Sequence, residues 1–519
     1  MTSGLHQQAT FSAQHLRAFA RYPDRIAFSW DGGALSYRGA LDLIGRFQAI
    51  FQASGLPAGS CVGVLSGNRA EAWCASIAAL ASRYMTTWLH PLGSLADQLY
   101  QLEDSGARLL IVDVDRFADR GEQLSVGASG VATTYTLGSA SFGVDMLAAA
   151  RDVGTQTARC FALPRDKATI FYTGGTTGRP KGVLRLHRQQ SHFAAANLVN
   201  FEFPEVPVYL AVAPISHVSA GMLLPTWIRG GRVHLHNGFN PGRMIAAIGK
   251  ERINFSLLVP TMIYALLDDP SLSSTDLSSL ELLLYGAAPM SASRLEEGLD
   301  RIGSVFSQIY GQSECIIIST LRRADHDLAR PDLLLSCGIP AVGCDVRLIG
   351  DDGQSVAAGM AGEICARAPW ALERYWNQPE QTSQAVVDGW LRTGDIARCD
   401  EQGYLYIVDR KKDMIVTGGF NVFPKEVEDV LSRHPKVGSV AVVGGPDPKW
   451  GEAVIAMIVP REGHVPDPAE LIEMVKAQKG AVSAPKEVRI VDRLPLTALG
   501  KIDKQAIKAA LWKGQERLV

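Results

Sequence analysis

The chain contains 519 residues, of which 47% are hydrophobic and 20% are charged, and its formal net charge at pH 7 is −2. A near-neutral charge, without a basic block interleaved with aromatic residues, excludes a general electrostatic affinity for nucleic acid or anionic membranes. The length exceeds what one hydrophobic core usually organises, so we expect at least two domains.

Eight cysteines lie far apart in the sequence and form no Cys-x-x-Cys pair. This spacing favours reduced thiols over a disulfide framework or a zinc site. Residues 1–11 lack the basic and apolar regions of a signal peptide. The most apolar stretch, residues 73–81, is too short to span a bilayer. We therefore expect a cytoplasmic protein that does not insert into membranes.

Short apolar runs alternate with helical patterns along the first four-fifths of the chain. Buried strands are predicted over residues 61–65, 109–113, 209–213 and 282–285. Helices are predicted over residues 39–53, 70–82 and 241–251. This alternation is typical of α/β layers with largely parallel sheets.

A charged segment at residues 409–413 follows the predicted strand 404–408 and marks the clearest domain boundary. Beyond it, the pattern predicts helices over 425–433 and 468–478 and strands over 440–444 and 453–459. These elements would form a small α+β unit, large enough to fold as its own domain. We place a large N-terminal domain at residues 1–409 and the small C-terminal domain at residues 410–519.

The most informative segment is Thr173-Gly174-Gly175-Thr176-Thr177-Gly178-Arg179-Pro180-Lys181-Gly182. Glycines allow backbone N–H groups to turn toward a ligand, threonine hydroxyls add donors, and Lys181 adds positive charge. This combination suits a polyphosphate, whereas the alternative is a surface turn between two strands. The segment differs from the common P-loop motif, because neither residue five positions after Gly174 or Gly175 is a glycine.

Four further motifs follow in order along the chain. They are Tyr310-Gly311-Gln312-Ser313-Glu314, Arg392-Thr393-Gly394-Asp395, Asp409-Arg410-Lys411-Lys412-Asp413 with Gly418-Gly419-Phe420-Asn421, and Pro495-Leu496-Thr497-Ala498-Leu499-Gly500-Lys501. With these motifs the chain resembles the adenylate-forming superfamily, which includes acyl- and aryl-CoA ligases, luciferases, peptide-synthetase adenylation domains and stand-alone amide ligases. The resemblance extends over nearly the whole chain. It implies an α/β fold with a large N-terminal domain of mixed sheets, a small mobile α+β C-terminal lid, and an active site between them.

The resemblance also implies the reaction: a carboxylic acid attacks the α-phosphate of ATP to form an acyl-adenylate. Bringing a carboxylate against a triphosphate requires positive charge and oriented donors. In the family the threonine–glycine loop closes on the β- and γ-phosphates, and the matching residues are Thr173, Thr176, Thr177, Gly178 and Lys181. Gly174 stands where the family usually has serine, so one hydroxyl donor is missing, which predicts slower adenylation or a different loop pose.

Other positions match the family's adenosine and magnesium sites. They are Gly286, Ala287, Ala288, Pro289, Tyr310, Gly311, Ser313, Asp395 and Arg410 for AMP or ATP, and Glu314 for Mg²⁺. By resemblance, Tyr310 faces adenine, Asp395 accepts both ribose hydroxyls, and Arg410 lies near the ribose or phosphate. Glu314 precedes an apolar run in which an unpaired charge would be costly, so a solvated surface glutamate is disfavoured.

The resemblance assigns further roles near the acid and in the C-terminal domain. Lys412 occupies the hinge position, and Lys501 is expected to reach the α-phosphate and the carboxylate during adenylation. His217 matches a position beside the acyl carboxylate, although a lone histidine can also be a buried core residue. The expected acyl pocket contains His217, Gly221, Met222, Gly338 and Ile339.

Two acceptors of the acyl group remain open. Gly418, Gly419, Phe420 and Trp450 match the tunnel for the pantetheine arm and favour CoA. Residues 481–484 carry neither the aromatic nor the basic residue that CoA ligases commonly have there, which weakens that choice. The alternative is an amine, as in coronafacate ligase and marinacarboline-type amide ligases. A third reading is an inactive nucleotide-binding sensor.

The predicted acid pocket is apolar and contains no obvious cation for a second carboxylate, which favours aromatic, cyclic or medium-chain monocarboxylates. Expected partners are this acid and CoA or an amine, with no nucleic acid, and a homodimer is one of the oligomeric states left open. His234 and His236 could share a strand face. Because no acidic or cysteine ligand is near them in sequence, we interpret them as strand-end polarity and not as a zinc site.

Overall fold

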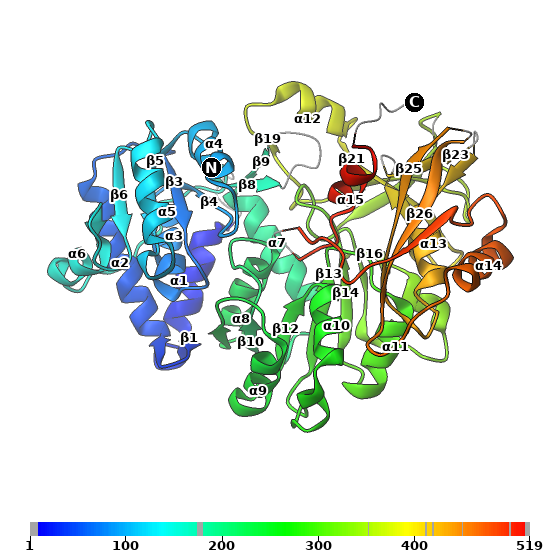
Figure 1. Ribbon diagram of the computed structural model, residues 1–519. Helices are drawn as coiled ribbons and strands as arrows, with labels where there is room; N and C mark the ends of the chain where they lie inside the picture. The colour runs from blue at the N-terminus through cyan, green and yellow to red at the C-terminus, as the bar shows by residue number, and fades with distance from the viewer. Residues whose placement is uncertain are drawn as a thin grey trace.

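The computed structural model describes residues 9–173, 180–350, 352–410, 413–417, 420–448, 450–497 and 500–513. It comprises a large N-terminal domain with three sheets and a smaller C-terminal domain with one (Figure 1). The α/β fold class is thereby confirmed. The boundary at residue 409 stays a prediction. Thr176, Thr177, Gly178, Lys412, Gly418 and Gly419 lie outside the described residues.

An eight-stranded sheet has the order β19-β9-β8-β4-β3-β5-β6-β7. Its strands are β3 (Cys61–Leu65), β4 (Met85–Trp88), β5 (Ala107–Val112), β6 (Thr133–Thr136), β7 (Val144–Asp145), β8 (Lys167–Thr173), β9 (Lys181–Leu186) and β19 (Arg374–Tyr375). The strands from β8 to β7 pair in parallel. At the other edge, β8 pairs with β9 and β9 pairs with β19, both antiparallel. The sheet is therefore mixed, and the threonine–glycine segment connects its β8–β9 hairpin.

A nine-stranded sheet has the order β16-β15-β14-β13-β12-β10-β11-β1-β2. Its strands are β1 (Ile26–Trp30), β2 (Gly33–Ser36), β10 (Val208–Ala211), β11 (Arg232–Leu235), β12 (Phe255–Leu258), β13 (Leu282–Gly286), β14 (Phe306–Tyr310), β15 (Ser319–Leu321) and β16 (Ile339–Pro340). Strands β1 and β10 to β14 are parallel, and the two edges are antiparallel. Every strand predicted in this domain overlaps an observed strand.

Helices fill the space between these two sheets. They are α1 (Phe11–Arg21), α2 (Tyr37–Ala53), α3 (Ala70–Ala81), α7 (His187–Asn200) and α8 (Leu223–Ile228). Trp227 is fully buried at their centre, packs against Phe19 and Phe28, and donates its indole N–H to the Ala27 carbonyl at 3.0 Å. Burial of such large aromatic surfaces supplies much of the stability of the domain.

The outer faces of the two sheets carry further helices. They are α4 (Leu95–Asp104), α5 (Val114–Gly127), α9 (Pro241–Glu251), α10 (Pro260–Asp268) and α11 (Ala292–Arg301), whereas α6 (Met146–Val153) packs mainly against α2 and shares its apolar cluster. The helix α9 has the predicted bounds, because Asn240 caps its first turn and Pro241 occupies the first helical position.

The remaining N-terminal sheet is antiparallel and contains β17 (Asp345–Ile349), β18 (Gly362–Arg367), β20 (Val386–Val387), β21 (Trp390–Cys399) and β22 (Leu405–Arg410), with α12 (Pro379–Ala385) beside it. The C-terminal domain contains β23 (Ile415–Thr417), β24 (Phe420–Val422), β25 (Val437–Asp447), β26 (Gly451–Pro460), β27 (Glu487–Ile490), α13 (Pro424–Leu431), α14 (Pro468–Lys479) and α15 (Lys504–Leu511). The small domain has its own apolar core of valine, isoleucine and leucine side chains. All four elements predicted there are observed.

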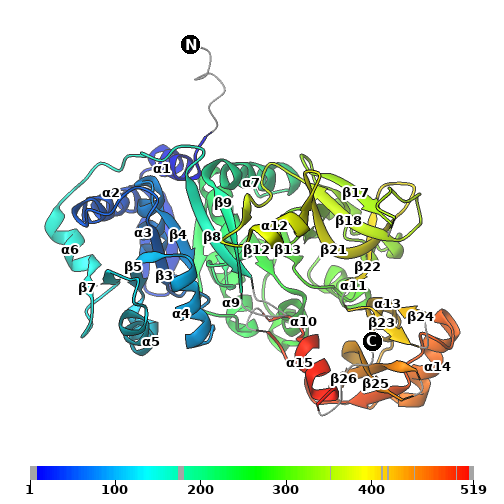
Figure 2. The same cartoon turned by 90° about the horizontal axis from the view of Figure 1, so that it is seen from above.

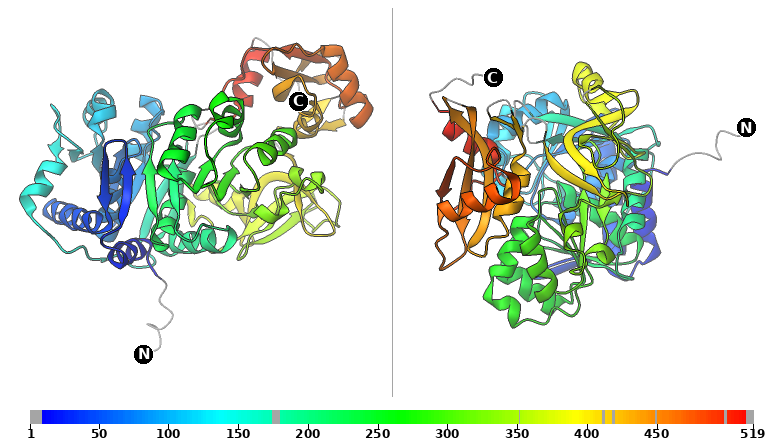
Figure 3. Two further views of the ribbon diagram at one scale, coloured as in Figure 1. Left: turned by 90° about the horizontal axis from the view of Figure 1, so that it is seen from below. Right: turned by 90° about the vertical axis from the view of Figure 1, so that its right-hand side faces the viewer.

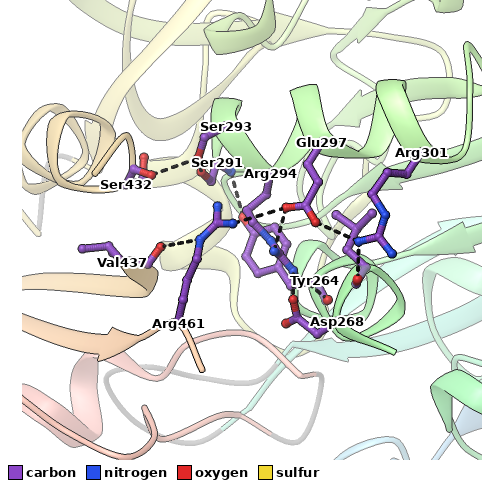
Figure 4. A network of polar contacts seen from close by, with 11 residues as sticks. Tyr264, Asp268, Ser291, Ser293, Arg294, Glu297, Arg301, Ser432, Val437 and Arg461 are labelled. Carbon is purple, nitrogen blue, oxygen red and sulfur yellow. Dashed lines mark hydrogen bonds and ion pairs between the residues drawn. The ribbon is translucent and has the colours of Figure 1, made fainter. Parts of the chain in front are cut away.

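The small domain packs beside α10 and α11 of the large domain (Figures 2 and 3). A polar network joins them: Ser293 donates to the Ser432 carbonyl at 2.9 Å, and Arg461 lies 3.7 Å from Glu297 (Figure 4). Glu297 also accepts from Arg294 and Arg301 of its own helix at 2.8 and 2.9 Å. These contacts orient the small domain so that its last loop faces the large domain.

Candidate active site

A cavity of about 1840 Å³ opens between the two domains. It is lined by most of the residues that the motifs indicate, which are Thr173, Lys181, His217, Gly221, Gly286, Ala287, Ala288, Pro289, Tyr310, Gly311, Ser313, Glu314, Asp395 and Lys501. These residues come from segments more than 300 positions apart, so the fold brings one set of side chains to a single site.

The β8–β9 hairpin supplies Thr173 and Lys181, which are paired directly across the two strands. The Lys181 ammonium lies 5.3 Å from the centre of the Tyr375 ring, a cation–π distance. The hairpin therefore directs a cation and a threonine into the cavity at the point where the threonine–glycine segment begins.

Glu314 is held at the cavity wall by its neighbours. The Tyr375 hydroxyl donates to Glu314 Oε1 at 2.7 Å. The Arg185 guanidinium supports the segment that carries Glu314, because it donates to the carbonyl oxygens of Ser313 and Trp370. Arg185 is almost fully buried, and burial lowers its pKa to about 10. A carboxylate beside the β8–β9 hairpin offers the hard oxygen ligand that Mg²⁺ prefers, so the residues fit the metal that the family implies.

Tyr310 and Gln312 converge on Asp395. The Tyr310 hydroxyl donates to Asp395 Oδ2 at 2.7 Å, and the Gln312 amide donates to the same oxygen at 2.8 Å. Burial, followed by the Asp395 carboxylate, raises the pKa of Tyr310 well above its usual value, so the phenol stays a hydrogen-bond donor. Asp395 and Arg410 are register partners on β21 and β22.

The turn after β13 approaches β14 closely. A Cβ atom on Gly286 would lie 2.1 Å from the Ile309 carbonyl oxygen, so only glycine fits there. Ala287, the next residue, has a positive φ of 65°. Such strain in a non-glycine residue persists where the surrounding structure imposes it, often at a ligand site.

His217 lies at the cavity wall between two aromatic rings. Its ring centre is 4.6 Å from that of His90 and 5.1 Å from that of Phe171, and its Nδ1 is 2.8 Å from the Ser216 hydroxyl. Burial, then the charges of His90 and Lys501, lower the pKa of His217 to about 3. The imidazole is therefore neutral near pH 7, and it faces the cavity.

The loop carrying Lys501 docks on α10. The Thr261 hydroxyl donates to the Gly500 carbonyl at 2.7 Å. Within the loop, the Thr497 amide donates to the Lys501 carbonyl, and the Lys501 amide donates to the Thr497 hydroxyl. The small domain thus inserts Lys501 into the same cavity that contains the β8–β9 hairpin and His217.

Five predicted residues do not reach the cavity wall. Met222 is fully buried behind it; Gly338 packs against β15, where a Cβ would lie 2.0 Å from the Thr320 carbonyl; and Ile339 packs against a separate apolar cluster. Phe420 and Trp450 are 60% and 38% exposed on the small domain. Met222, Gly338 and Ile339 thus do not line the cavity in this structure, and their place in the acyl pocket stays a prediction, as do the acceptor roles of Phe420 and Trp450. The side chain of Arg410 is not described.

Sequence reasoning missed several polar residues. Gln312 could have been identified from the sequence, because it belongs to the Tyr310–Glu314 motif. His90, Arg185 and Tyr375 carry no local signal, since each meets the site only through long-range packing. Asp31 is remote from His234 and His236 in sequence but close in space, because ligand atoms of all three lie within 4.8 Å of one another. However, Asp31 already accepts from Arg243 at 2.5 Å.

Comparison with known proteins identifies the class. The model of the AMP-binding enzyme family matches residues 16–376, and the model of the AMP-binding enzyme C-terminal domain matches residues 426–501. The chain therefore belongs to the AMP-binding enzyme family, within the adenylate-forming superfamily, and is an ATP-dependent acid ligase.

Among relatives, a medium/long-chain-fatty-acid–CoA ligase of Mycobacterium tuberculosis is 44% identical over 493 residues, which cover 92% of this chain and 86% of that protein. A feruloyl-CoA synthase of Amycolatopsis is 40% identical over 346 residues, or 66% of this chain and 70% of that one. The amide bond synthetase McbA of Marinactinospora thermotolerans has a similar structure, with a TM-score of 0.89, 31% identity, and coverage of 96% of this chain and 99% of that chain. In the described part of this chain, no helix has the length and apolar character needed to cross a bilayer.

Proposed function

We propose that the protein activates an apolar monocarboxylic acid as its acyl-adenylate and transfers the acyl group to the thiol of CoA. The observation that carries this proposal is the shared cavity. Its wall contains Lys501 of the small domain together with the β8–β9 hairpin, Asp395 and the neutral His217 of the large domain. Groups for triphosphate, ribose and acid are therefore close enough to act on one ATP and one carboxylate.

Each group has a role that its chemistry supports. Lys181, with the threonines of its loop, binds the β- and γ-phosphates, and Asp395 accepts the ribose hydroxyls while Tyr310 and Gln312 hold its position. Glu314 would hold Mg²⁺, which when bound neutralises phosphate charge. Because Lys501 approaches from the opposite domain, its ammonium is placed to offset the charges of the carboxylate and the α-phosphate together.

The neutral state of His217 suits the acid side of the site. A neutral imidazole can hydrogen-bond a carboxylate without forming an ion pair that would stabilise the ground state. The cavity wall nearby is apolar, with Ile215, Val218 and Leu257 among its residues. An aromatic, cyclic or medium-chain acid is therefore our proposed substrate, and the fatty-acid and feruloyl relatives support this range.

For the acceptor, we favour CoA because the most similar relatives named above are CoA ligases. Phe420 and Trp450 lie exposed on the small domain and do not line the cavity, so their proposed acceptor role needs a movement of that domain, for which Lys412 is the proposed hinge. The amine alternative is supported by the structural similarity to an amide bond synthetase and by the missing ring and charge at residues 481–484. The homodimer remains a prediction.

The test is pyrophosphate release with a panel of aromatic, cyclic and medium-chain acids, followed by product analysis with CoA and with free amino acids. Acid-dependent pyrophosphate release and a CoA thioester are the expected results. Formation of an amide without a CoA thioester would mean that the acceptor is an amine. No pyrophosphate with any acid would favour the inactive sensor and refute the proposal.

A further inference from the structure

The cavity continues from the phosphate side into the space between the two large sheets. Thr173, Phe171 and Thr169 alternate along one face of β8, and all three line the cavity. Phe171 contacts His217, and Thr169 pairs with Thr86 on β4. Two residues of a strand span roughly 7 Å, so the row of Thr169 and Thr86 lies about that much deeper than His217.

The wall at this depth is mostly apolar and comes from α1, α3, α7 and β4. Its apolar members include Phe11, Ile77, Leu80, Trp88, Phe193 and Ala194. The tail of an acid bound with its carboxylate beside His217 would extend into this region. The region therefore selects the tail, provided that the proposed adenylation function is correct.

The polar groups of Ser76, Thr169 and Gln190 in this wall are hydrogen-bonded, but two other polar atoms are not. The indole N–H of Trp73 and the hydroxyl of Thr86 are buried, with residue exposures of 5% and 1%. Among the described residues, neither atom has a hydrogen-bond partner. Buried donors in native proteins are nearly always paired, so two unpaired ones in a ligand cavity call for an explanation.

These two atoms belong to one wall. Thr86 and Trp88 lie on the same face of β4, and the Trp88 indole donates to the Ser76 hydroxyl of α3 at 3.2 Å. Trp73 stands one helical turn before Ser76, and its ring centre is 6.0 Å from that of Trp88. The strand and the helix thus bring both residues to the same end of the cavity.

An indole N–H can only donate, so its partner must be an acceptor, and a threonine hydroxyl can donate or accept. The cation in the same row, Arg185, donates to the carbonyls of Ser313 and Trp370. We propose that Trp73 and Thr86 form a subsite for a neutral oxygen at the far end of the acid. The substrates are then monocarboxylic acids with a hydroxyl, methoxy or carbonyl group roughly 7–10 Å from the carboxylate, such as a phenolic cinnamate or an ω-hydroxy acid.

The test compares acids that are matched in size. The pairs are 4-hydroxycinnamate with 4-methylcinnamate and 8-hydroxyoctanoate with nonanoate, and kcat/KM is measured from pyrophosphate release. The hydroxylated member of at least one pair should be favoured by about tenfold, as expected for one hydrogen bond that only this member can make. Equal use of both members in both pairs would overturn the proposal, as would preference for an ω-dicarboxylate over the hydroxy acid.

Two variants test the residues. Thr86→Val keeps the shape of the side chain and Trp73→Phe removes the N–H; each should lower the preference for the hydroxylated member of a pair about fivefold. Thr87→Val is the matched control, because Thr87 is equally buried and its hydroxyl is also unpaired among the described residues, but it does not line the cavity. A similar loss in Thr87→Val would overturn the assignment.

Failure of the proposed function is distinguishable from failure of this inference. The ratio within each pair is measured at adenylation, before any acceptor reacts, so a missing CoA thioester leaves it intact. If no acid releases pyrophosphate, calorimetric dissociation constants of the same pairs replace kcat/KM. Equal dissociation constants within both pairs would then overturn the subsite.

Discussion

Replacing Lys501 by alanine is expected to remove formation of the acyl-adenylate and to spare its consumption. The loop of Lys501 is docked on α10 by the bond from Thr261 to the Gly500 carbonyl, and Lys501 shares the cavity with His217. Its charge also acts on His217, as the lowered pKa of that histidine indicates. Loss of one preorganised group of this kind costs about 2.7–4 kcal/mol, or roughly a 100- to 1000-fold lower rate.

The two half-reactions are measured separately. Acid-dependent exchange of labelled pyrophosphate into ATP reports formation of the adenylate, and reaction of a synthetic acyl-adenylate with CoA reports its consumption. Lys513→Ala, which removes an exposed lysine of the same C-terminal segment, is the control and should keep both rates within about twofold of wild type. Exchange by Lys501→Ala within tenfold of wild type, or equal loss of both half-reactions, would refute the reasoning.

Three further predictions concern docking, pH and the domain interface. Thr261→Val removes the bond to Gly500 and should lower pyrophosphate exchange about fivefold, without changing adenylate consumption; an unchanged exchange rate would contradict this. Burial lowers the pKa of His187 to about 4 in the folded protein. Between pH 6.5 and 4 the unfolded chain therefore binds a proton at this histidine and the folded chain does not, so stability falls as the pH drops through this range. In urea titrations, His187→Leu should therefore reduce the loss of unfolding free energy between pH 7.5 and 5.5 by about 1 kcal/mol, and an unchanged loss would count against the assignment. Arg461→Ala removes a partly exposed ion pair with Glu297 and should lower exchange by less than about fivefold; a far larger effect would mean that this contact holds the domains together more strongly than its geometry implies.

Much of the fold follows from local patterns. The buried runs at 61–65 and 282–285 became strands β3 and β13, and the pattern over 241–251 became α9 with the predicted bounds. Most of the described motif residues also line the cavity, because each motif carries its polar groups within a few residues of a turn. Predictions from such short-range features needed no knowledge of the packing.

The sequence was least informative where distant segments meet. The resemblance places Gly338 and Ile339 in the acyl pocket, but antiparallel pairing of β16 with β15 keeps them off the cavity wall. Arg185 gave no signal within its apolar strand, although it supports the carbonyl of Ser313 from 128 positions away. Likewise, nothing local in the sequence shows that Asp31 approaches His234 and His236.

The sequence by itself determined the α/β architecture, the class of reaction and the chemical type of most groups that we propose to contact ATP, since hydrophobic periodicity and motif composition act over a few residues. Only the tertiary structure decided that burial lowers the pKa of His217, that Lys501 lines the same cavity as the β8–β9 hairpin, and that Trp73 Nε1 and Thr86 Oγ1 have no hydrogen-bond partner among the described residues. Each of these properties depends on desolvation or contact between elements that are remote in the chain, and burial and distance are defined only once the sheets and domains have packed.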